Sequence, residues 1–144
     1  MKVLIQKCTK ASVTIDNQIH NEIEKGYVVF VGFTEGDSIK QIEYLAKKVA
    51  NLRIFEDENH VMNYSILDVK GSILSISQFT LYADTKKGNR PSYINSLNRE
   101  EATKLYDLWN QVLTDYVPVK SGIFGADMQV LLINDGPTTI SLEN

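Results

Sequence analysis

GYVVFVGF, residues 26–33, is an almost continuous apolar run that is rich in β-branched and aromatic side chains. Such a run predicts a strand that is buried on both faces and therefore lies inside a sheet. The chain before it predicts strands over 2–6 and 11–15, a turn at Asp16-Asn17, and a short strand that ends at Ile23. We therefore expect a small β-meander that leads into a central strand.

Two segments have apolar residues at helical spacing. The first, 38–52, opens with Ser38 and Gln41, which form the pattern of a capping box. The second, 99–116, follows Asn98, a favourable residue for a helix start. The apolar stripe of the second helix, which we interpret as part of the core, consists of Ala102, Leu105, Trp109, Val112, Leu113 and Tyr116.

Three further strands are predicted over 72–82, 128–134 and 139–142. The acidic segment EDENH at 56–60 lacks the spacing and the glycine of a calcium loop, so we interpret it as a solvent-facing loop. No internal repeat and no Gly/Ser-rich linker divides the chain. The sequence therefore predicts one α/β domain of the α+β type over residues 1–144, with strands that outnumber the two helices.

Composition narrows the function classes. The apolar fraction is 43% and the charged fraction is 23%, which is typical of a globular protein. The N-terminus MKVLIQKCTK has neither a signal-peptide core nor a membrane span, so we expect a cytoplasmic protein with no membrane partner. Cys8 is the only cysteine, and His20 and His60 are the only histidines, so we expect no disulfide, no metal and no cofactor.

The common catalytic motifs are absent: the chain has no G-x-S-x-G, Walker, G-x-G-x-x-G or H-E-x-x-H sequence. Two polar clusters remain, SQFT at 77–80 and NDGPTT at 134–139. Buried polar groups at a strand end need either a turn network or a ligand. For NDGPTT, a simple turn that joins a hairpin is the simpler interpretation. The alternative is a cis Gly136-Pro137 bond whose carbonyl oxygens form a rigid wall for a small chiral group.

The net charge of −3 requires that a nucleic-acid partner meet a local basic patch. The candidate patch is TKKGNR, with Lys86, Lys87 and Arg90, which follows SQFT closely. Such a charge run is more often a solvated loop than an RNA contact. Its position after the polar strand end is the observation that favours RNA binding.

Four segments carry a resemblance that spans nearly the whole chain. They are FEDENHVMNYSILDV at 55–69, SQFTLYADTKKGNRPSY at 77–93, KSGIFGADMQV at 120–130 and NDGPTT at 134–139. In this order and at these distances they resemble the D-aminoacyl-tRNA deacylases, enzymes that remove D-amino acids wrongly esterified to tRNA. The resemblance implies a barrel-like core and a homodimer. It also implies hydrolysis of D-aminoacyl-tRNA and glycyl-tRNA to free amino acid and tRNA.

The resemblance also implies roles for individual residues. Gly136 and Pro137 of one subunit would enter the pocket of the other, where their cis peptide would exclude the side chain of an L-amino acid. Thr138 stands where the family usually has valine. Ser77, Gln78 and Phe79 would form the pocket floor, with N–H groups near Phe79 and Thr80 as oxyanion donors. Phe124 and Met128 would line the adenosine end, and Lys86, Lys87 and Arg90 would meet tRNA phosphates.

An aminoacyl ester is already reactive, and the vicinal 2′-hydroxyl of the ribose assists water, so this chemistry requires orientation more than a nucleophile. Two alternatives stay open on the sequence. One is a non-catalytic RNA-binding or dimerisation module. The other is a general esterase with Thr80 as its nucleophile, although the Thr80 hydroxyl has no obvious base partner.

Overall fold

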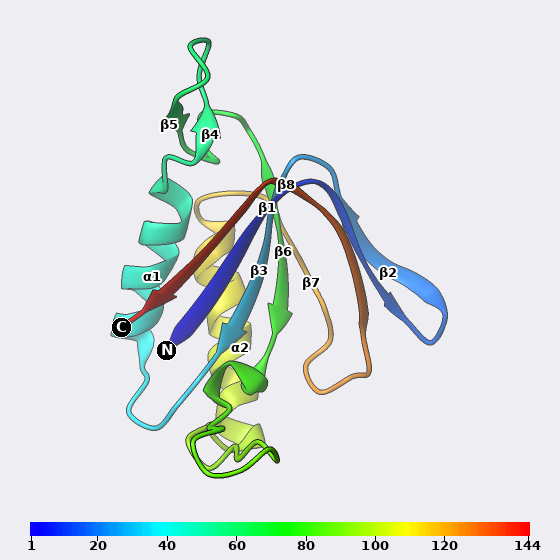
Figure 1. The fold of residues 1–144 in the computed structure, drawn as a ribbon, viewed down its shortest axis with the longest axis vertical. Coiled ribbons are helices and arrows are strands. Elements are labelled where there is room, and N and C mark those ends of the chain that lie inside the picture. The colour runs from blue at the N-terminus through cyan, green and yellow to red at the C-terminus, as the bar shows by residue number, and fades with distance from the viewer.

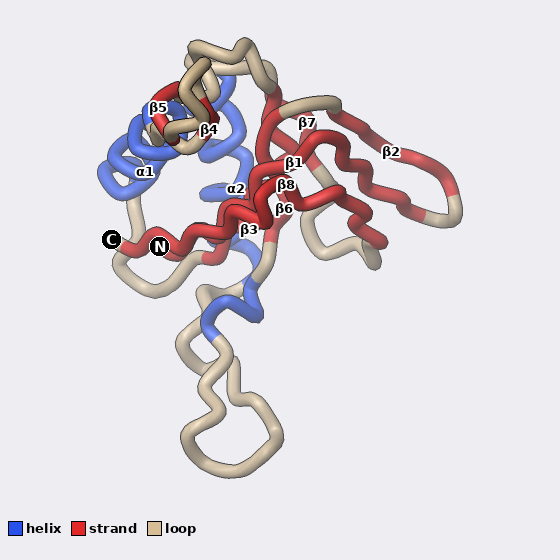
Figure 2. Tube along the Cα trace, turned by 45° about the horizontal axis from the view of Figure 1, so that its top comes forward, coloured by secondary structure: helices blue, strands red, loops and turns tan.

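A computed structural model describes residues 1–144 and contains one large mixed sheet with two helices behind it (Figure 1). The strands follow the order β2-β1-β3-β6-β7, and β8 pairs with the free side of β1. The sheet curls into a nearly closed, barrel-like shape, as expected from the resemblance (Figure 2). The elements are β1 (Lys2–Ile15), β2 (Gln18–Ile23), β3 (Gly26–Gly32), α1 (Ile39–Asn51), β4 (Phe55–Glu56), β5 (Met62–Tyr64), β6 (Ser72–Ser77), η1 (Phe79–Tyr82), α2 (Arg99–Thr114), β7 (Val119–Ser121) and β8 (Gln129–Glu143).

The central strand is confirmed. β3 lies between β1 and β6, and all of its residues except Phe30 are buried. The separate strands predicted over 2–6 and 11–15 are wrong, because β1 runs without a break from Lys2 to Ile15. Its first half pairs with β3 and its second half with β2. The polar residues between the two halves therefore mark a change of partner and do not end the strand.

The strand predicted over 72–82 is too long. β6 ends at Ser77, and after Gln78 the chain turns into the short 3-10 helix η1. The Gln78 backbone N–H still donates to the Val31 oxygen of β3 at 2.7 Å. SQFT therefore begins at a strand end, as expected, but most of it lies in a helical turn.

The prediction of a hairpin turn in NDGPTT is also wrong. Both halves of β8 run antiparallel to β1, with Asn134 opposite Cys8 and Thr139 opposite Gln6. Residues 135–138 therefore bulge out of one continuous strand, opposite a single residue of β1. The Gly136-Pro137 peptide bond is cis, as in the alternative interpretation.

Both helices begin where the sequence predicts. The Ser38 N–H donates to Gln41 Oε1 at 3.0 Å, and Asn98 Oδ1 accepts from the Glu101 N–H at 3.1 Å. The helices cover one face of the sheet and bury Trp109 completely in a cluster of 20 side chains. Tyr116 was predicted to be part of the core but is 37% exposed, because α2 ends at Thr114 and the stripe ends with it. The EDENH loop is largely exposed, as predicted.

Neither α1 nor α2 is long and apolar enough to cross a membrane.

Candidate active site

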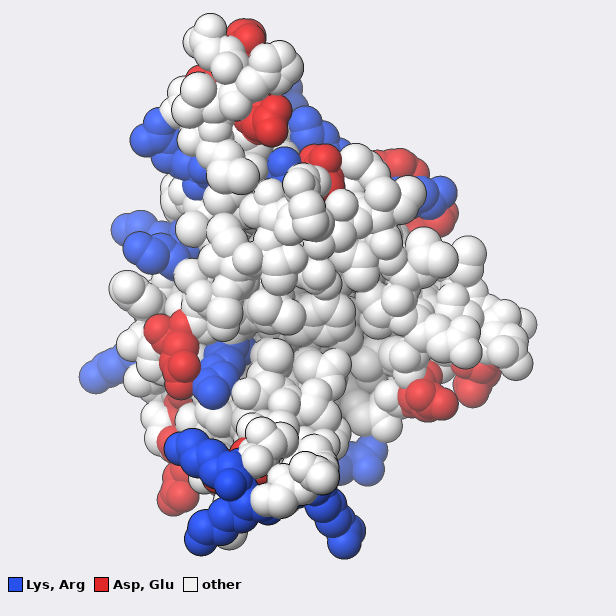
Figure 3. Space-filling model, in the orientation of Figure 1, with Lys and Arg blue, Asp and Glu red and all other residues white.

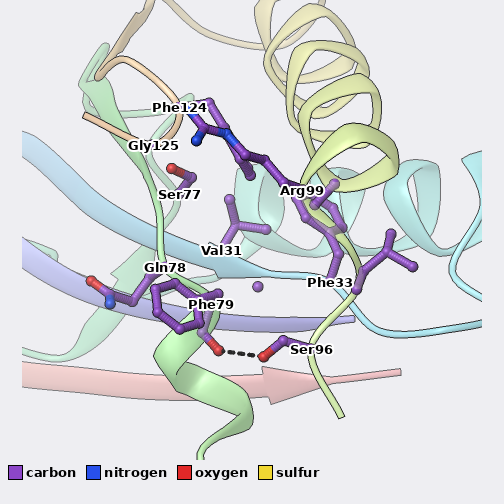
Figure 4. A pocket seen from close by; sticks show the side chains of 12 residues that line it. Val31, Phe33, Ser77, Gln78, Phe79, Ser96, Arg99, Phe124 and Gly125 are labelled. Atoms are coloured by element: carbon purple, nitrogen blue, oxygen red, sulfur yellow. Dashed lines mark hydrogen bonds between the residues drawn. The ribbon is translucent and has the colours of Figure 1, made fainter. Parts of the chain in front are cut away.

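The site lies where three parallel strands end. β3, β6 and β7 run in the same direction, so their carboxyl ends at Gly32, Ser77 and Ser121 meet at one edge of the sheet. Ligands of open α/β sheets bind at such an edge. Two adjoining pockets of about 290 Å³ and about 320 Å³ open there. The residues that line both pockets are Ser77, Gln78, Phe79, Phe124 and Gly125 (Figure 4).

The predicted residues Ser77, Gln78 and Phe79 form one wall. Phe79 is 56% exposed, and its ring meets the Tyr93 ring edge-on with a centroid distance of 4.9 Å. The Ser96 hydroxyl donates to the Phe79 carbonyl at 3.0 Å and so joins this wall to the segment before α2 (Figure 4). The structure therefore brings the predicted pocket floor together on a turn that is held against the segment before α2.

Thr80 does not line either pocket. Its hydroxyl accepts a hydrogen bond from the Gln78 side-chain amide, so its contact with the site runs through Gln78. An amide is not a base, and neither histidine lines the pockets. The geometry therefore offers no group that would activate Thr80 as a nucleophile.

The N–H groups of Phe79 and Thr80 lie in the first turn of η1. The first N–H groups of a helix have no acceptor within that helix. They are therefore suitable donors for a carbonyl oxygen that develops negative charge.

A buried network supports the pocket from behind. Ser75 is fully buried in β6, two residues before Ser77. Trp109 Nε1 donates to Ser75 Oγ at 3.2 Å, and the Tyr106 hydroxyl donates to the Ser75 carbonyl at 2.8 Å. Burial raises the pKa of the Tyr106 phenol, which keeps it a hydrogen-bond donor. Trp109 was predicted to be a core residue, but its contact with Ser75 was not predicted, because Ser75 has no distinguishing sequence pattern.

The segment after β7 forms the opposite wall. Phe124 lines both pockets and Met128 lines the second, and their assignment to the adenosine end stays a prediction. Gly125 has φ +73°, and a Cβ atom there would lie 2.8 Å from Arg99 Nη2. The Arg99 side chain therefore lies directly against Gly125 (Figure 4). Arg99 is the one basic residue that lines either pocket. It was not predicted as a site residue, because in the sequence Arg99 marks only the start of a helix.

Gly136, Pro137 and Thr138 do not line the pockets of their own chain. Gly136 and Pro137 are exposed at the tip of the β8 bulge, and Gly136 has φ +109°. Asn134 closes the base of the bulge: its Nδ2 donates to the Lys7 oxygen at 2.9 Å and to the Thr138 oxygen at 3.0 Å. The bulge is thus a fixed projection that points away from the strand.

A buried lysine pairs with the bulge. Lys7 Nζ lies 3.1 Å from Asp135 Oδ2, and the exposed fractions of the two side chains are 5% and 42%. Asp135 directly precedes Gly136. No role was predicted for Lys7, since nothing in the local sequence indicates that its side chain is buried.

Lys86, Lys87 and Arg90 lie on the exposed loop between η1 and α2. This loop projects from the body of the molecule (Figure 2), and Figure 3 shows Lys and Arg side chains gathered at that end. The Lys86 N–H donates to Asp84 Oδ1 at 2.9 Å, and Asp84 pairs with Ser92 across the loop. The basic residues therefore sit on a closed loop that starts directly after the pocket wall.

Nothing at the site is arranged as a metal centre, since no group of three or more His, Cys, Asp or Glu side chains is placed to hold a metal ion. Fold and site together define an α/β protein whose ligand pocket lies at the ends of parallel strands. The pocket contains no nucleophile that is paired with a base.

Comparison with known proteins gives the family. A family model described as D-Tyr-tRNA(Tyr) deacylase matches residues 4–143. A solved structure described as a c-Myc DNA Unwinding Element Binding Protein is 39% identical, covers 100% of this chain and 99% of its own, and has a TM-score of 0.95. A second structure, described as a probable eukaryotic D-amino acid tRNA deacylase, has the same fold. It is 16% identical, covers 98% of this chain and 97% of its own, and has a TM-score of 0.83.

The chain therefore belongs to the D-Tyr-tRNA(Tyr) deacylase family. It is a hydrolase that acts on D-aminoacyl-tRNA, as the resemblance predicted.

Proposed function

We propose that the paired pockets hold the aminoacyl ester and terminal adenosine of D-aminoacyl-tRNA and of glycyl-tRNA, and that L-aminoacyl esters are rejected by Gly136-Pro137 of a second subunit. The observation that carries this proposal is the position of Ser77, Gln78 and Phe79 at the ends of parallel strands, in a chain of this family. A cytoplasmic location is a further prediction, because aminoacyl-tRNA is the substrate.

Catalysis in this proposal is positional. Ser77 and Gln78 contact the ester, and the first N–H groups of η1 donate hydrogen bonds to its carbonyl oxygen as negative charge develops there. Phe124 and Met128 hold the adenine ring, which leaves the vicinal hydroxyl of the ribose free to assist water. Thr80 orients the Gln78 amide and does not attack the substrate.

The proposed dimer rests on two features of the chain. The Gly136-Pro137 tip and the pocket do not meet within one subunit, so the filter needs a second copy. The middle of the face on which β8 and β1 lie shows no charged side chains (Figure 3), and Leu131 and Ile133 of β8 are 61% and 57% exposed. An exposed apolar patch of this kind is typical of a protein interface.

The loop with Lys86, Lys87 and Arg90 would meet phosphates of the tRNA acceptor end. Such contacts carry no sequence information and weaken as salt increases. We therefore expect KM for D-aminoacyl-tRNA to rise with salt, and replacement of the three residues by glutamine to reduce that dependence.

The direct test is hydrolysis of D-tyrosyl-tRNA, glycyl-tRNA and L-tyrosyl-tRNA by the purified protein. We expect release of D-tyrosine and glycine while the L-ester survives at its spontaneous rate. Equal survival of all three esters would leave the rival function, a nucleic-acid-binding module. The DNA-binding description of the 39% identical structure is the observation that favours that rival.

The cross-subunit filter has a sharper test. One variant carries Phe124→Arg, which blocks the pocket, and the other carries one extra residue between Gly136 and Pro137. Each homodimer should lack selective D-activity, whereas a heterodimer holds one intact pocket opposite one intact tip. An equal mixture after subunit exchange should therefore regain about a quarter of the native sites. If the mixture shows no more selective D-activity than the two separate homodimers together, the tip does not act across subunits.

A further inference from the structure

Arg99 lies on the pocket without a partner of its own. Its guanidinium is against Gly125, between the Phe124 wall and the start of α2 (Figure 4). Its backbone oxygen accepts a hydrogen bond from the Thr103 hydroxyl at 2.7 Å. The guanidinium itself makes no hydrogen bond and no ion pair within the chain.

The neighbouring acidic residues are engaged elsewhere. Glu100 pairs with Lys104 at 2.8 Å, and Glu101 accepts from the Asn98 side chain at 2.6 Å. Asp127 lines the second pocket but lies beyond ion-pair distance of Arg99. Because Arg99 remains charged at every physiological pH, this position gives the pocket a fixed positive charge.

Gly125 leaves room for the Arg99 guanidinium. Any Cβ atom at Gly125 would lie 2.8 Å from the guanidinium, so the Arg99 side chain would have to shift from its present position. The absence of a side chain at Gly125 thus lets the cation lie beside Phe124, the residue that we assign to the adenine ring.

We infer that Arg99 binds the phosphate that links the last two nucleotides of the tRNA acceptor end. This inference rests on the proposed function, since it takes the adenine ring to lie on Phe124 and Met128. The 5′-phosphate of a nucleotide is one ribose away from its base, and Arg99 is next to Phe124 through Gly125. A guanidinium matches a phosphate with two parallel hydrogen bonds. The α-ammonium of the amino acid is also cationic, so charge repulsion places it away from Arg99.

The probe is a non-hydrolysable D-tyrosyl-3′-aminoadenosine amide, with and without a 5′-phosphate. The native protein should bind the phosphorylated form roughly tenfold more tightly, the scale of one partly exposed charged contact. Arg99→Gln should bind both forms equally and should keep its affinity for the form without phosphate. Arg99→Lys should retain part of the preference. Lys104→Gln is the matched control, because it removes one positive charge from the same helix away from the pocket.

Titration calorimetry on the four proteins gives the result, and hydrolysis of D-tyrosyl-tRNA by the native protein is measured beside it. An undiminished preference for the phosphorylated probe in Arg99→Gln, or no such preference in the native protein, would overturn the inference. If the native protein still hydrolyses D-tyrosyl-tRNA selectively, the proposed function is not affected by that result. Loss of the preference in Lys104→Gln as well would overturn the inference too, since the effect would then be one of net charge. Absence of selective hydrolysis would refute the proposed function itself.

Discussion

Replacing Asp135 should destabilise the fold more than replacing Lys7, although the two residues form one ion pair. Lys7 is 5% exposed and Asp135 is 42% exposed, so only the lysine depends on its partner for compensation of its charge. Asp135→Asn leaves a buried ammonium without a counter-charge. Loss of one partner of a fully buried pair costs 3 to 5 kcal/mol, and solvent at the carboxylate reduces this to about 2 kcal/mol here. Lys7→Met leaves a carboxylate that water solvates, so its cost should be below about 1 kcal/mol.

Urea unfolding of both single variants and of the double variant measures these free energies. Asp135→Asn should be the less stable single variant, and the double variant should recover part of that loss, because it removes the buried charge itself. Two results would refute the reasoning: Asp135→Asn within 0.5 kcal/mol of the native protein, or Lys7→Met as the more destabilised single variant. Either would mean that water reaches Lys7.

Three further perturbations have defined outcomes. Gly136→Ala should lose selective D-activity, because its φ of +109° and a contact of 2.7 Å from the new Cβ to Thr138 Oγ1 shift the tip; Gly36→Ala, at φ +87° with open space around it, is the control and should stay active. Trp109→Phe should lower the free energy of unfolding by about 2 kcal/mol in urea, since it leaves Ser75 Oγ without its donor and removes buried volume. Burial raises the pKa of the Cys8 thiol from 9.0 to about 11. The unfolded thiol therefore ionises first, so the stability present below pH 9 should fall by up to roughly 2 kcal/mol between about pH 9 and pH 11. Cys8→Ala should show a shallower fall, and equal slopes for both proteins would contradict this.

Local signals in the sequence were sufficient to predict the two helices, because the contacts that fix their starts lie within a few residues along the chain. The capping residues Ser38 and Asn98 bond to atoms three residues away, so their pattern is readable along the chain. The continuity of β8 is different, because its two halves are joined by their common pairing with β1, more than 100 residues away. A sequence read locally shows Gly136-Pro137 as a break, and only the distant partner strand shows that it is a bulge.

The same limit applies within the site. The SQFT cluster at 77–80 was singled out because buried polar groups at a strand end need a turn network or a ligand, and the resemblance then implied the pocket roles of Ser77, Gln78 and Phe79. Arg99 looks like any exposed residue of a helix start, and Ser75 looks like any small residue in a strand. Their roles arise from parts of the chain that fold against them, namely Gly125 and Trp109. Contacts between distant segments leave no periodic pattern, so sequence periodicity could not reveal them.

The arrangement also determines where selectivity is expressed. In the proposed function, Phe124, Met128 and Arg99 face the nucleotide end of the substrate, which is the same in D- and L-aminoacyl-tRNA. Contacts shared by both substrates contribute equally to their binding and cannot separate them. Discrimination must therefore come from the group that meets the α-carbon, which in the proposed function is the main chain of Gly136-Pro137. A wall of main-chain atoms excludes one hand of the amino acid whatever its side chain, whereas a side-chain pocket would sort amino acids by size. Weak preference among D-amino acids, together with strict rejection of L-amino acids, is the kinetic pattern that follows.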